Sequence, residues 1–121
     1  MIRVLIAEDN PVNRELLREL LNPRDYAVSE ACDGQEALLM LESSRPDILL
    51  LDVGMPVLNG YEVVRKIRSD PRLATLPVLA VTAYAMQGDR EKLLQSGFDG
   101  YLEKPIRSRA LAAEMDRLLQ L

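Results

Sequence analysis

The chain has 121 residues, of which 48% are apolar, and its 15 basic and 19 acidic side chains give a formal net charge of −4. These values indicate one soluble globular domain. They argue against a general nucleic-acid binder, which needs a basic face, and against membrane insertion, because no apolar run approaches the ~18–20 residues that span a bilayer. The absence of histidine and the presence of a single cysteine exclude an internal disulfide, every histidine-dependent catalytic triad and every histidine-ligated zinc site.

Two hydrophobic periods alternate along the chain. Short apolar runs, typical of buried strands, are followed by segments whose apolar side chains recur at helical spacing. This pattern predicts five strands, at residues 2–7, 26–32, 48–51, 78–81 and 99–102. It also predicts five helices, at residues 13–21, 35–43, 61–68, 87–96 and 107–121.

Local signals refine this assignment. The first helix carries an apolar stripe of leucines at positions 16, 17, 20 and 21, and Asn22-Pro23 ends it. The run 48–51 is the most apolar of the predicted strands, which places it at the centre of the sheet. Strands that alternate with helices predict a doubly wound α/β fold with a five-stranded parallel sheet. The strand order 2-1-3-4-5 is expected by analogy with known folds of this class.

Four of the predicted strands end next to side chains that can do chemistry. Glu8 and Asp9 follow the first strand, Asp52 the third, Thr82 the fourth and Lys104 the fifth. In open α/β sheets the ligand site lies beyond the carboxyl ends of the strands. We therefore expect three carboxylates, a hydroxyl and an ammonium group to converge on one crevice.

This set of groups favours a particular chemistry. Carboxylates that lie within a few ångströms repel one another, and a bound divalent cation removes that repulsion. With no histidine available, the ligands must be oxygens, and Mg²⁺ prefers one or two carboxylates together with a phosphate oxygen. The remaining carboxylate can then act as a nucleophile and form an aspartyl phosphate. Lys104 would neutralise the phosphoryl oxygens, and Thr82 would donate a hydrogen bond to one of them.

Each residue taken alone also has a purely structural interpretation. Asp52 can be a loop cap, Thr82 can satisfy backbone groups at a strand end, and Lys104 can be a solvated charge. Tyr101 can be a half-buried sheet residue, and Cys32 is expected to be a small buried apolar group. The coincidence of suitable residues at four strand ends favours a site over these interpretations.

Several stretches of the sequence resemble the receiver domains of two-component response regulators. These stretches are Glu8-Asp9-Asn10, Asp33-Gly34-Gln35-Glu36-Ala37, Leu51-Asp52-Val53-Gly54-Met55-Pro56, Asn59-Gly60, Val81-Thr82-Ala83 and Lys104-Pro105-Ile106. The segments 10–14 and 82–86 are similar to receivers of hybrid kinases and of single-domain cell-cycle regulators. The resemblance covers essentially the whole chain. It implies that residues 1–121 form one receiver domain of flavodoxin-like, chemotaxis-regulator-like fold, with no output domain.

The resemblance also implies roles for individual residues. Asp52 would be the phosphoacceptor. Mg²⁺, or Mn²⁺ in its place, would be bound by Asp52, by Asp9 directly, by Glu8 mainly through water and by the backbone carbonyl of Gly54. Lys104 would pair with the phosphoryl group and would precede a cis peptide bond to Pro105, a form found in only about 5–6% of X-Pro bonds.

A second group of residues would control the response. Thr82 and Tyr101 would be the switch pair: the hydroxyl moves toward the phosphoryl group, the ring rotates into the space that the hydroxyl leaves, and the face of helix four, strand five and helix five changes its partner preference. Gly54 and Tyr84, each two residues after a site residue, would modulate the lifetime of the phosphoryl group. An aromatic side chain at position 84 would shield it from water.

The resemblance also implies the partners, and the absence of histidine from this chain fits them. The phosphoryl donor would be a histidine on a sensor histidine kinase or on a histidine phosphotransfer protein, docked on the first helix near Val12 and Leu16. The switched face would bind a downstream target protein. The chain would act in the cytoplasm as a signalling switch that catalyses only its own phosphorylation and dephosphorylation.

Three other functions fit the sequence less well. A haloacid-dehalogenase-like phosphatase needs an Asp two residues after the nucleophile, where this chain has Gly54. A flavin or nucleotide carrier needs a phosphate-binding first loop, but residues 8–11 are acidic. A scaffold that has lost the chemistry has no need of the full set of acids, Thr82 and Lys104. The kinase, the target, the oligomeric state and the choice between a stand-alone protein and an excised domain stay open.

Overall fold

Five strands and five α-helices alternate along the described part of the chain, as expected. The computed structural model describes residues 1–83 and 87–120. The strands are β1 (Arg3–Ala7), β2 (Ala27–Ala31), β3 (Ile48–Asp52), β4 (Val78–Thr82) and β5 (Gly100–Glu103). The helices are α1 (Pro11–Leu21), α2 (Gly34–Ser43), α3 (Gly60–Ser69), α4 (Gln87–Gln95) and α5 (Ser108–Leu119), and a 3₁₀ turn, η1 (Asn22–Arg24), follows α1.

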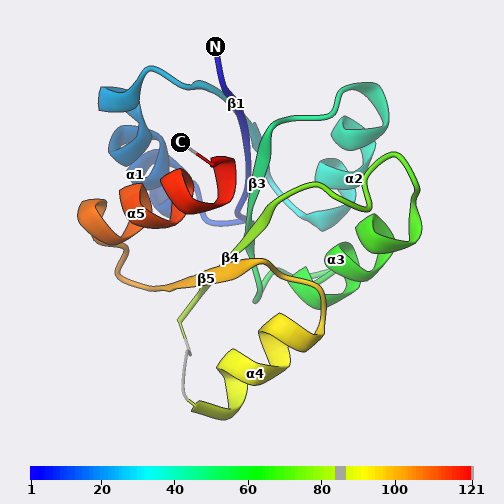
Figure 1. Cartoon of the computed structure of the whole chain (residues 1–121). Coiled ribbons are helices and arrows are strands. Elements are labelled where there is room, and N and C mark those ends of the chain that lie inside the picture. The colour runs from blue at the N-terminus through cyan, green and yellow to red at the C-terminus, as the bar shows by residue number, and fades with distance from the viewer. Residues whose placement is uncertain (84–86, 121) are drawn as a thin grey trace.

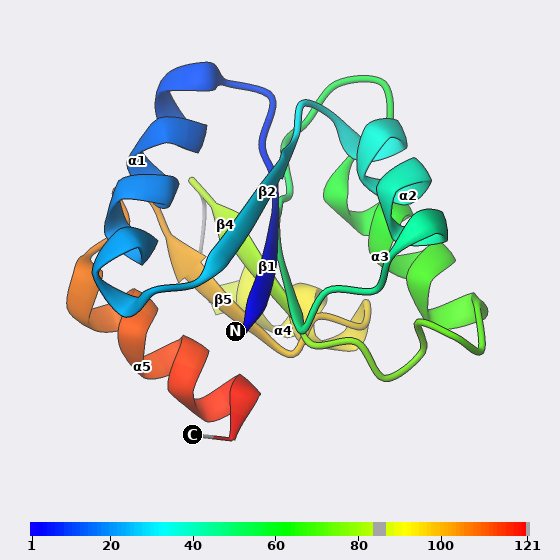
Figure 2. The ribbon, with the colours of Figure 1, turned by 90° about the horizontal axis from the view of Figure 1, so that it is seen from above.

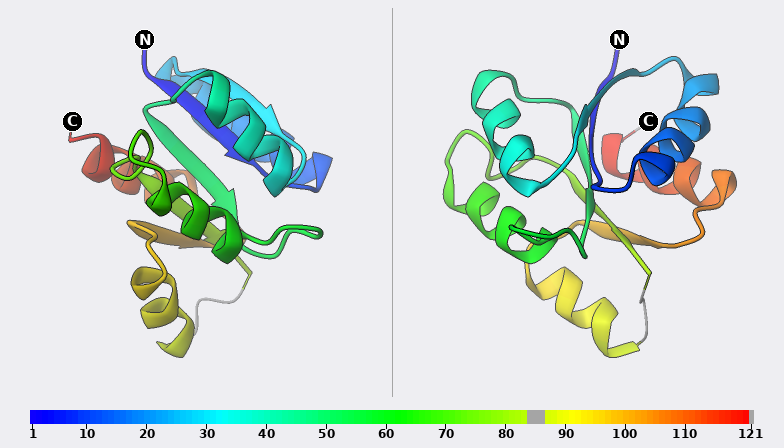
Figure 3. Two further views of the ribbon diagram at one scale, coloured as in Figure 1. Left: turned by 90° about the vertical axis from the view of Figure 1, so that its right-hand side faces the viewer. Right: turned by 180° about the vertical axis from the view of Figure 1, so that it is seen from behind.

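The strands form one parallel sheet in the order β2-β1-β3-β4-β5, which confirms the prediction. Helices α1 and α5 cover one face of the sheet, and α2, α3 and α4 cover the other (Figures 1 and 2). The start of β1 and the end of α5 lie at the same end of the molecule (Figure 3). That end is the amino-terminal edge of the sheet, so the carboxyl edge is free to form a site.

The core consists of two layers that share the central strand. All five residues of β3 are buried. Ile48 and Leu50 pack in the cluster under α1 and α5, whereas Leu49 and Leu51 pack in the cluster under α2, α3 and α4. Successive side chains of a strand point to opposite faces, so an unbroken apolar run serves both layers.

Side-chain caps define where the helices begin. The Asn10 side chain accepts hydrogen bonds from the backbone nitrogens of Val12 and Asn13, so α1 begins at Pro11, two residues earlier than predicted. Proline suits the first helical position because it fixes φ and has no N–H to leave unpaired. At α3 the side chain of Asn59 caps the nitrogen of Glu62, whose side chain caps Asn59 in return. These caps hold the loops that follow β1 and β3.

One expectation about burial was wrong. Cys32 is exposed, because it directly follows Ala31, whose side chain is fully buried, and successive side chains at a strand end point in opposite directions. Leu16 of α1 is 41% exposed and its neighbour Leu17 is buried, so Leu16 lies at the helix surface, where the sequence analysis places a docking contact. In the described part of the chain, no helix is long and apolar enough to cross a membrane.

Candidate functional site

Three carboxylates meet at the carboxyl edge of the sheet, as the sequence predicts. Glu8 and Asp9 directly follow β1, and Asp52 is the last residue of the neighbouring strand β3. One carboxylate oxygen from each of the three residues lies within 4.8 Å of the other two. Glu8 and Asp52 are 1% and 6% exposed, whereas Asp9 is open to solvent. The cluster is therefore buried at its base and accessible from one side.

Lys104 brings a positive charge into this cluster. Its Nζ lies 3.1 Å from Oε2 of Glu8 and 3.6 Å from Oδ1 of Asp52. Its backbone nitrogen donates to the carbonyl of Thr82 at 2.7 Å, and its peptide bond to Pro105 is cis, the form that the resemblance implies. The loop after β5 is thus fixed against the end of β4, and the lysine side chain extends across the sheet edge to the acids.

One ammonium group does not balance the acids. Burial, followed by the charge of Asp52, raises the pKa of the Glu8 carboxyl, and the hydrogen bonds from Lys104 and from the Asn10 backbone offset this only in part. The cluster therefore favours an additional cation. Its donors are all oxygens, and one of them is exposed, which suits a hard divalent ion that retains part of its water shell.

Two glycines fix how Asp52 is presented. The backbone nitrogen of Gly54 donates to Oδ1 of Asp52 at 3.1 Å, which orients the carboxylate. A Cβ at Gly54 would meet only that same oxygen, at 4.0 Å, so this side of Asp52 is open. A Cβ at Gly60 would lie 2.8 Å from Cα of Val53 and 2.9 Å from the carbonyl oxygen of Asp52. Glycine at position 60 lets α3 pack directly against the end of β3.

The two residues expected to form a switch lie on adjacent strands. Thr82 is buried at the end of β4, and Tyr101 of β5 is half-buried against the core under α3 and α4. Tyr101 pairs with Ala80 in register, two residues before Thr82, so both side chains project from the same face of the sheet. The guanidinium carbon of Arg90 lies 5.8 Å from the centre of the Tyr101 ring. Tyr84 lies outside the described residues.

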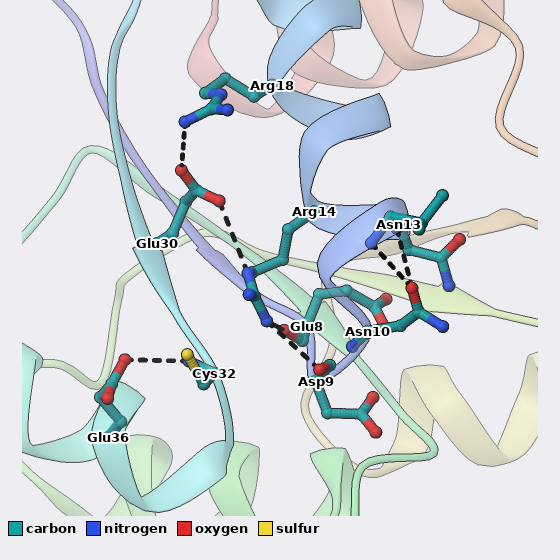
Figure 4. A network of polar contacts seen from close by, with 10 residues as sticks. Glu8, Asp9, Asn10, Asn13, Arg14, Arg18, Glu30, Cys32 and Glu36 are labelled. Carbon is teal, nitrogen blue, oxygen red and sulfur yellow. Dashed lines mark hydrogen bonds and ion pairs between the residues drawn. The ribbon is translucent and has the colours of Figure 1, made fainter.

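One residue near the site has no predicted role. Arg14 of α1 donates from Nη1 to the backbone carbonyls of Glu8 at 2.8 Å and Asp9 at 3.2 Å. Figure 4 shows its guanidinium between these carbonyls and Glu30 of β2. Nothing in the local sequence signals this contact, because it depends on how α1 packs beside β1 and β2.

The chain is similar to known proteins of one family. A family model described as the response regulator receiver domain matches residues 4–116. The polar-differentiation response regulator DivK of Brucella anthropi is 41% identical over 103 residues, which cover 85% of this chain and 84% of DivK.

Solved receiver structures are also similar over nearly the whole chain. The receiver domain of the sensor histidine kinase PA1611 from Pseudomonas aeruginosa, with magnesium coordinated in its active-site cleft, has a TM-score of 0.91 at 38% identity and covers 99% of this chain and 98% of that one. The receiver domain of Saccharomyces cerevisiae Ssk1, in complex with the histidine phosphotransfer protein Ypd1, has a TM-score of 0.88 at 30% identity and covers 97% and 88%.

Proposed function

The chain belongs to the response regulator receiver domains of two-component signalling, and from this premise we propose that Asp52 accepts a phosphoryl group from a histidine of a partner protein. The observation that carries the proposal is the geometry around Asp52. A buried carboxylate is oriented by the Gly54 N–H, lies 3.6 Å from the Lys104 ammonium, and has two further acids within 4.8 Å. The chain is a signalling switch rather than a metabolic enzyme.

The transfer is a substitution at phosphorus. A carboxylate oxygen of Asp52 attacks, a phosphorus–oxygen bond forms, and the bond from phosphorus to the donor's imidazole nitrogen breaks with its electron pair left on that nitrogen. Lys104 lies close enough to Asp52 to pair with the incoming phosphoryl oxygens. Thr82, at the end of the adjacent strand β4, donates its hydroxyl to one of these oxygens. Later attack by water returns Asp52 to its free form.

The acidic cluster would hold Mg²⁺, with Mn²⁺ as a substitute. Asp9 and Asp52 would bind directly, Glu8 mainly through water, and Gly54 through its backbone carbonyl. The bound ion supplies neutralisation of the phosphoryl charge during transfer. Burial and the charge of Asp52 raise the pKa of Glu8, and a bound cation would offset both effects. The exposure of Asp9 gives the ion access.

The phosphoryl group would be read out at the α4-β5-α5 face. Thr82 and Tyr101 would act as the switch pair, since both side chains project from the face of the sheet that carries α4. A surface hollow between α4, β5 and α5 is lined by Tyr101, Arg90 and Arg117 among others. A downstream target protein would bind here, with an affinity that depends on the Tyr101 rotamer. Gly54 and Tyr84 would set how fast the phosphoryl group is lost.

The donor would be a sensor histidine kinase or a histidine phosphotransfer protein in the cytoplasm. The chain has no histidine of its own, and the similar Ssk1 receiver forms a complex with a histidine phosphotransfer protein. Val12 and Leu16 of α1 are 71% and 41% exposed, which gives a docking partner an apolar contact beside the acidic cluster.

The test is phosphorylation by a small donor. The protein is incubated with Mg²⁺ and acetyl phosphate, and its intact mass is measured beside that of Asp52→Asn and of a control, Asp70→Asn, whose carboxylate pairs with Arg72 far from the site. We expect one added phosphoryl group in the native chain and in the control. No addition is expected in Asp52→Asn or in EDTA. Equal labelling of Asp52→Asn would contradict the proposal.

A further inference from the structure

Arg14 lies behind the acidic cluster rather than in it. Its side chain is only 17% exposed, and its Nη1 donates to the carbonyl oxygens of Glu8 and Asp9. Its Nε lies 3.6 Å from Oε1 of Glu30, whose other oxygen accepts from Arg18 at 2.8 Å. Figure 4 shows the guanidinium on the β2 side of the loop, with the Asp9 carboxylate directed away from it.

The other polar groups of this loop are held by different partners. The backbone nitrogen of Glu8 donates to the carbonyl of Ala31 at 3.1 Å, which continues the β1–β2 pairing. The backbone nitrogen of Asn10 donates to Oε1 of Glu8 at 3.2 Å, and the Asn10 side chain caps α1. Arg14 supplies the donor for the two carbonyls that follow β1. Because each peptide unit is planar, fixing these carbonyls fixes the directions in which the Glu8 and Asp9 side chains leave the chain.

We propose that Arg14 is a positioning residue for the divalent-cation site, acting through the backbone of Glu8 and Asp9. This inference rests on the proposed function of the acidic cluster. The guanidinium holds the peptide units so that the carboxylates reach the ion without further ordering of the loop. Outer-shell groups that orient metal ligands typically change metal affinity about 10- to 100-fold when they are removed.

A positional role and a purely electrostatic role for Arg14 predict opposite effects of its replacement on Mg²⁺ affinity. If Arg14 acted only through its charge, replacing it by a neutral side chain would remove a cation near the site and would tighten Mg²⁺ binding. If it acts by holding the carbonyls, the same replacement weakens binding, because the loop must be ordered by the ion itself. Glu30, 3.6 Å from the guanidinium, offsets part of the Arg14 charge, and we expect the positional effect to dominate.

The chain offers a matched control. Arg18 forms an ion pair with the same Glu30 carboxylate but is 54% exposed, and its guanidinium donates to Glu30 at 2.8 Å rather than to the loop carbonyls. Arg18→Met therefore disturbs the ion pair and leaves the carbonyl contacts in place. Arg14→Lys keeps the charge but loses the planar fork that spans both carbonyls and Glu30.

The experiment measures the Kd for Mg²⁺ by calorimetry, and by the amide chemical shifts of residues 8–10, in the native chain, Arg14→Met, Arg14→Lys and Arg18→Met. We expect Arg14→Met to raise the Kd about tenfold and Arg14→Lys to raise it at least threefold. Arg18→Met should stay within twofold of the native value. With acetyl phosphate as donor, saturating Mg²⁺ should restore the phosphorylation rate of Arg14→Met to within about twofold, since only metal affinity has changed.

Three results would overturn the inference. These are unchanged or tighter Mg²⁺ binding by Arg14→Met, native binding by Arg14→Lys, and equal weakening in all three variants, which would assign the effect to the Glu30 ion pairs. If Arg14→Met does not fold, as judged by circular dichroism, the Kd values of Arg14→Lys and Arg18→Met test the inference instead. Equal Mg²⁺ affinity in these two variants would overturn it. Failure of the native chain to bind Mg²⁺ would instead refute the proposed function, so the two claims are distinguishable.

Discussion

Replacement of Gly60 by alanine is expected to disturb both the fold and the phosphoacceptor. Gly60 is the first residue of α3, and its backbone nitrogen donates to the carbonyl of Val53 at 3.0 Å. A Cβ would lie 2.8 Å from Cα of Val53 and 2.9 Å from the carbonyl oxygen of Asp52. Ordinary carbon contacts are ~3.5–4.0 Å, so α3 and the end of β3 must separate by about 1 Å.

The magnitude follows from two opposing effects. Alanine favours a helix over glycine by up to ~1 kcal/mol in the interior of a helix and by less at its first residue. Overpacking costs roughly 1–3 kcal/mol, and it dominates because the obstructing atoms are backbone atoms that cannot rotate away. We expect the free energy of unfolding to fall by about 1–2 kcal/mol, and the melting temperature by about 3–8 °C. Phosphorylation of Asp52 should slow as well, because misplacement by about 1 Å can cost ~10²-fold in rate.

Gly54→Ala is the matched control, since it adds the same methyl group beside the same aspartate. There the Cβ meets only Oδ1 of Asp52, at 4.0 Å. Urea denaturation should give a free energy of unfolding within about 0.5 kcal/mol of the native value for this variant. The steric argument fails if Gly60→Ala is as stable as Gly54→Ala and is phosphorylated at the native rate.

Three further predictions concern stability measured by urea denaturation. Arg68→Met should lower the free energy of unfolding by about 2–3 kcal/mol, because the guanidinium donates to three loop carbonyls and to Asp99. The control is Arg72→Met: the Arg72 side chain is 62% exposed, so its removal should leave the urea midpoint unchanged. Equal losses of stability in the two variants would contradict this prediction. Asn59→Ala should lower the free energy of unfolding by about 1 kcal/mol, because the capping box at the start of α3 is lost. An unchanged urea midpoint would refute a stabilising role for this cap. Burial and a nearby carboxylate raise the pKa of Glu8 above its ordinary value of 4.5, so folding binds a proton and metal-free stability falls as pH rises from 4.5 through the raised pKa. In EDTA, Glu8→Gln should therefore gain stability relative to the native chain as the pH rises over that window. A difference in unfolding free energy between the two proteins that stays constant with pH would contradict the raised pKa of Glu8.

Much of the fold follows from sequence periodicity. The run 48–51 predicts a strand buried on both faces, and β3 is the fully buried central strand. Val63, Val64 and Ile67 have helical spacing, and all three are buried in α3. The helix starts were less accurate, as at Pro11, because a cap depends on where one side chain folds back rather than on periodicity.

The convergence of the acids was predictable for a topological reason. Parallel strands end at one edge, so residues that follow β1 and β3 must lie together once the fold class is known. Lys104 reaches the same edge from β5, and its contacts with Glu8 and Asp52 follow from that placement. The exposure of Cys32 and the contacts of Arg14 were not predictable. The first depends on which face of an edge strand is covered, and the second on the packing of a helix against a neighbouring strand.

The most direct test of the central claim is to locate the phosphoryl group. The protein is treated with Mg²⁺ and acetyl phosphate and then with borohydride, which reduces an acyl phosphate to an alcohol and so converts a phosphorylated aspartate to homoserine. Peptide mass spectrometry then identifies the converted residue. The account predicts conversion at Asp52 that depends on Mg²⁺ and is absent when the donor is omitted. Conversion at a different acid, or Mg²⁺-independent conversion, would contradict it.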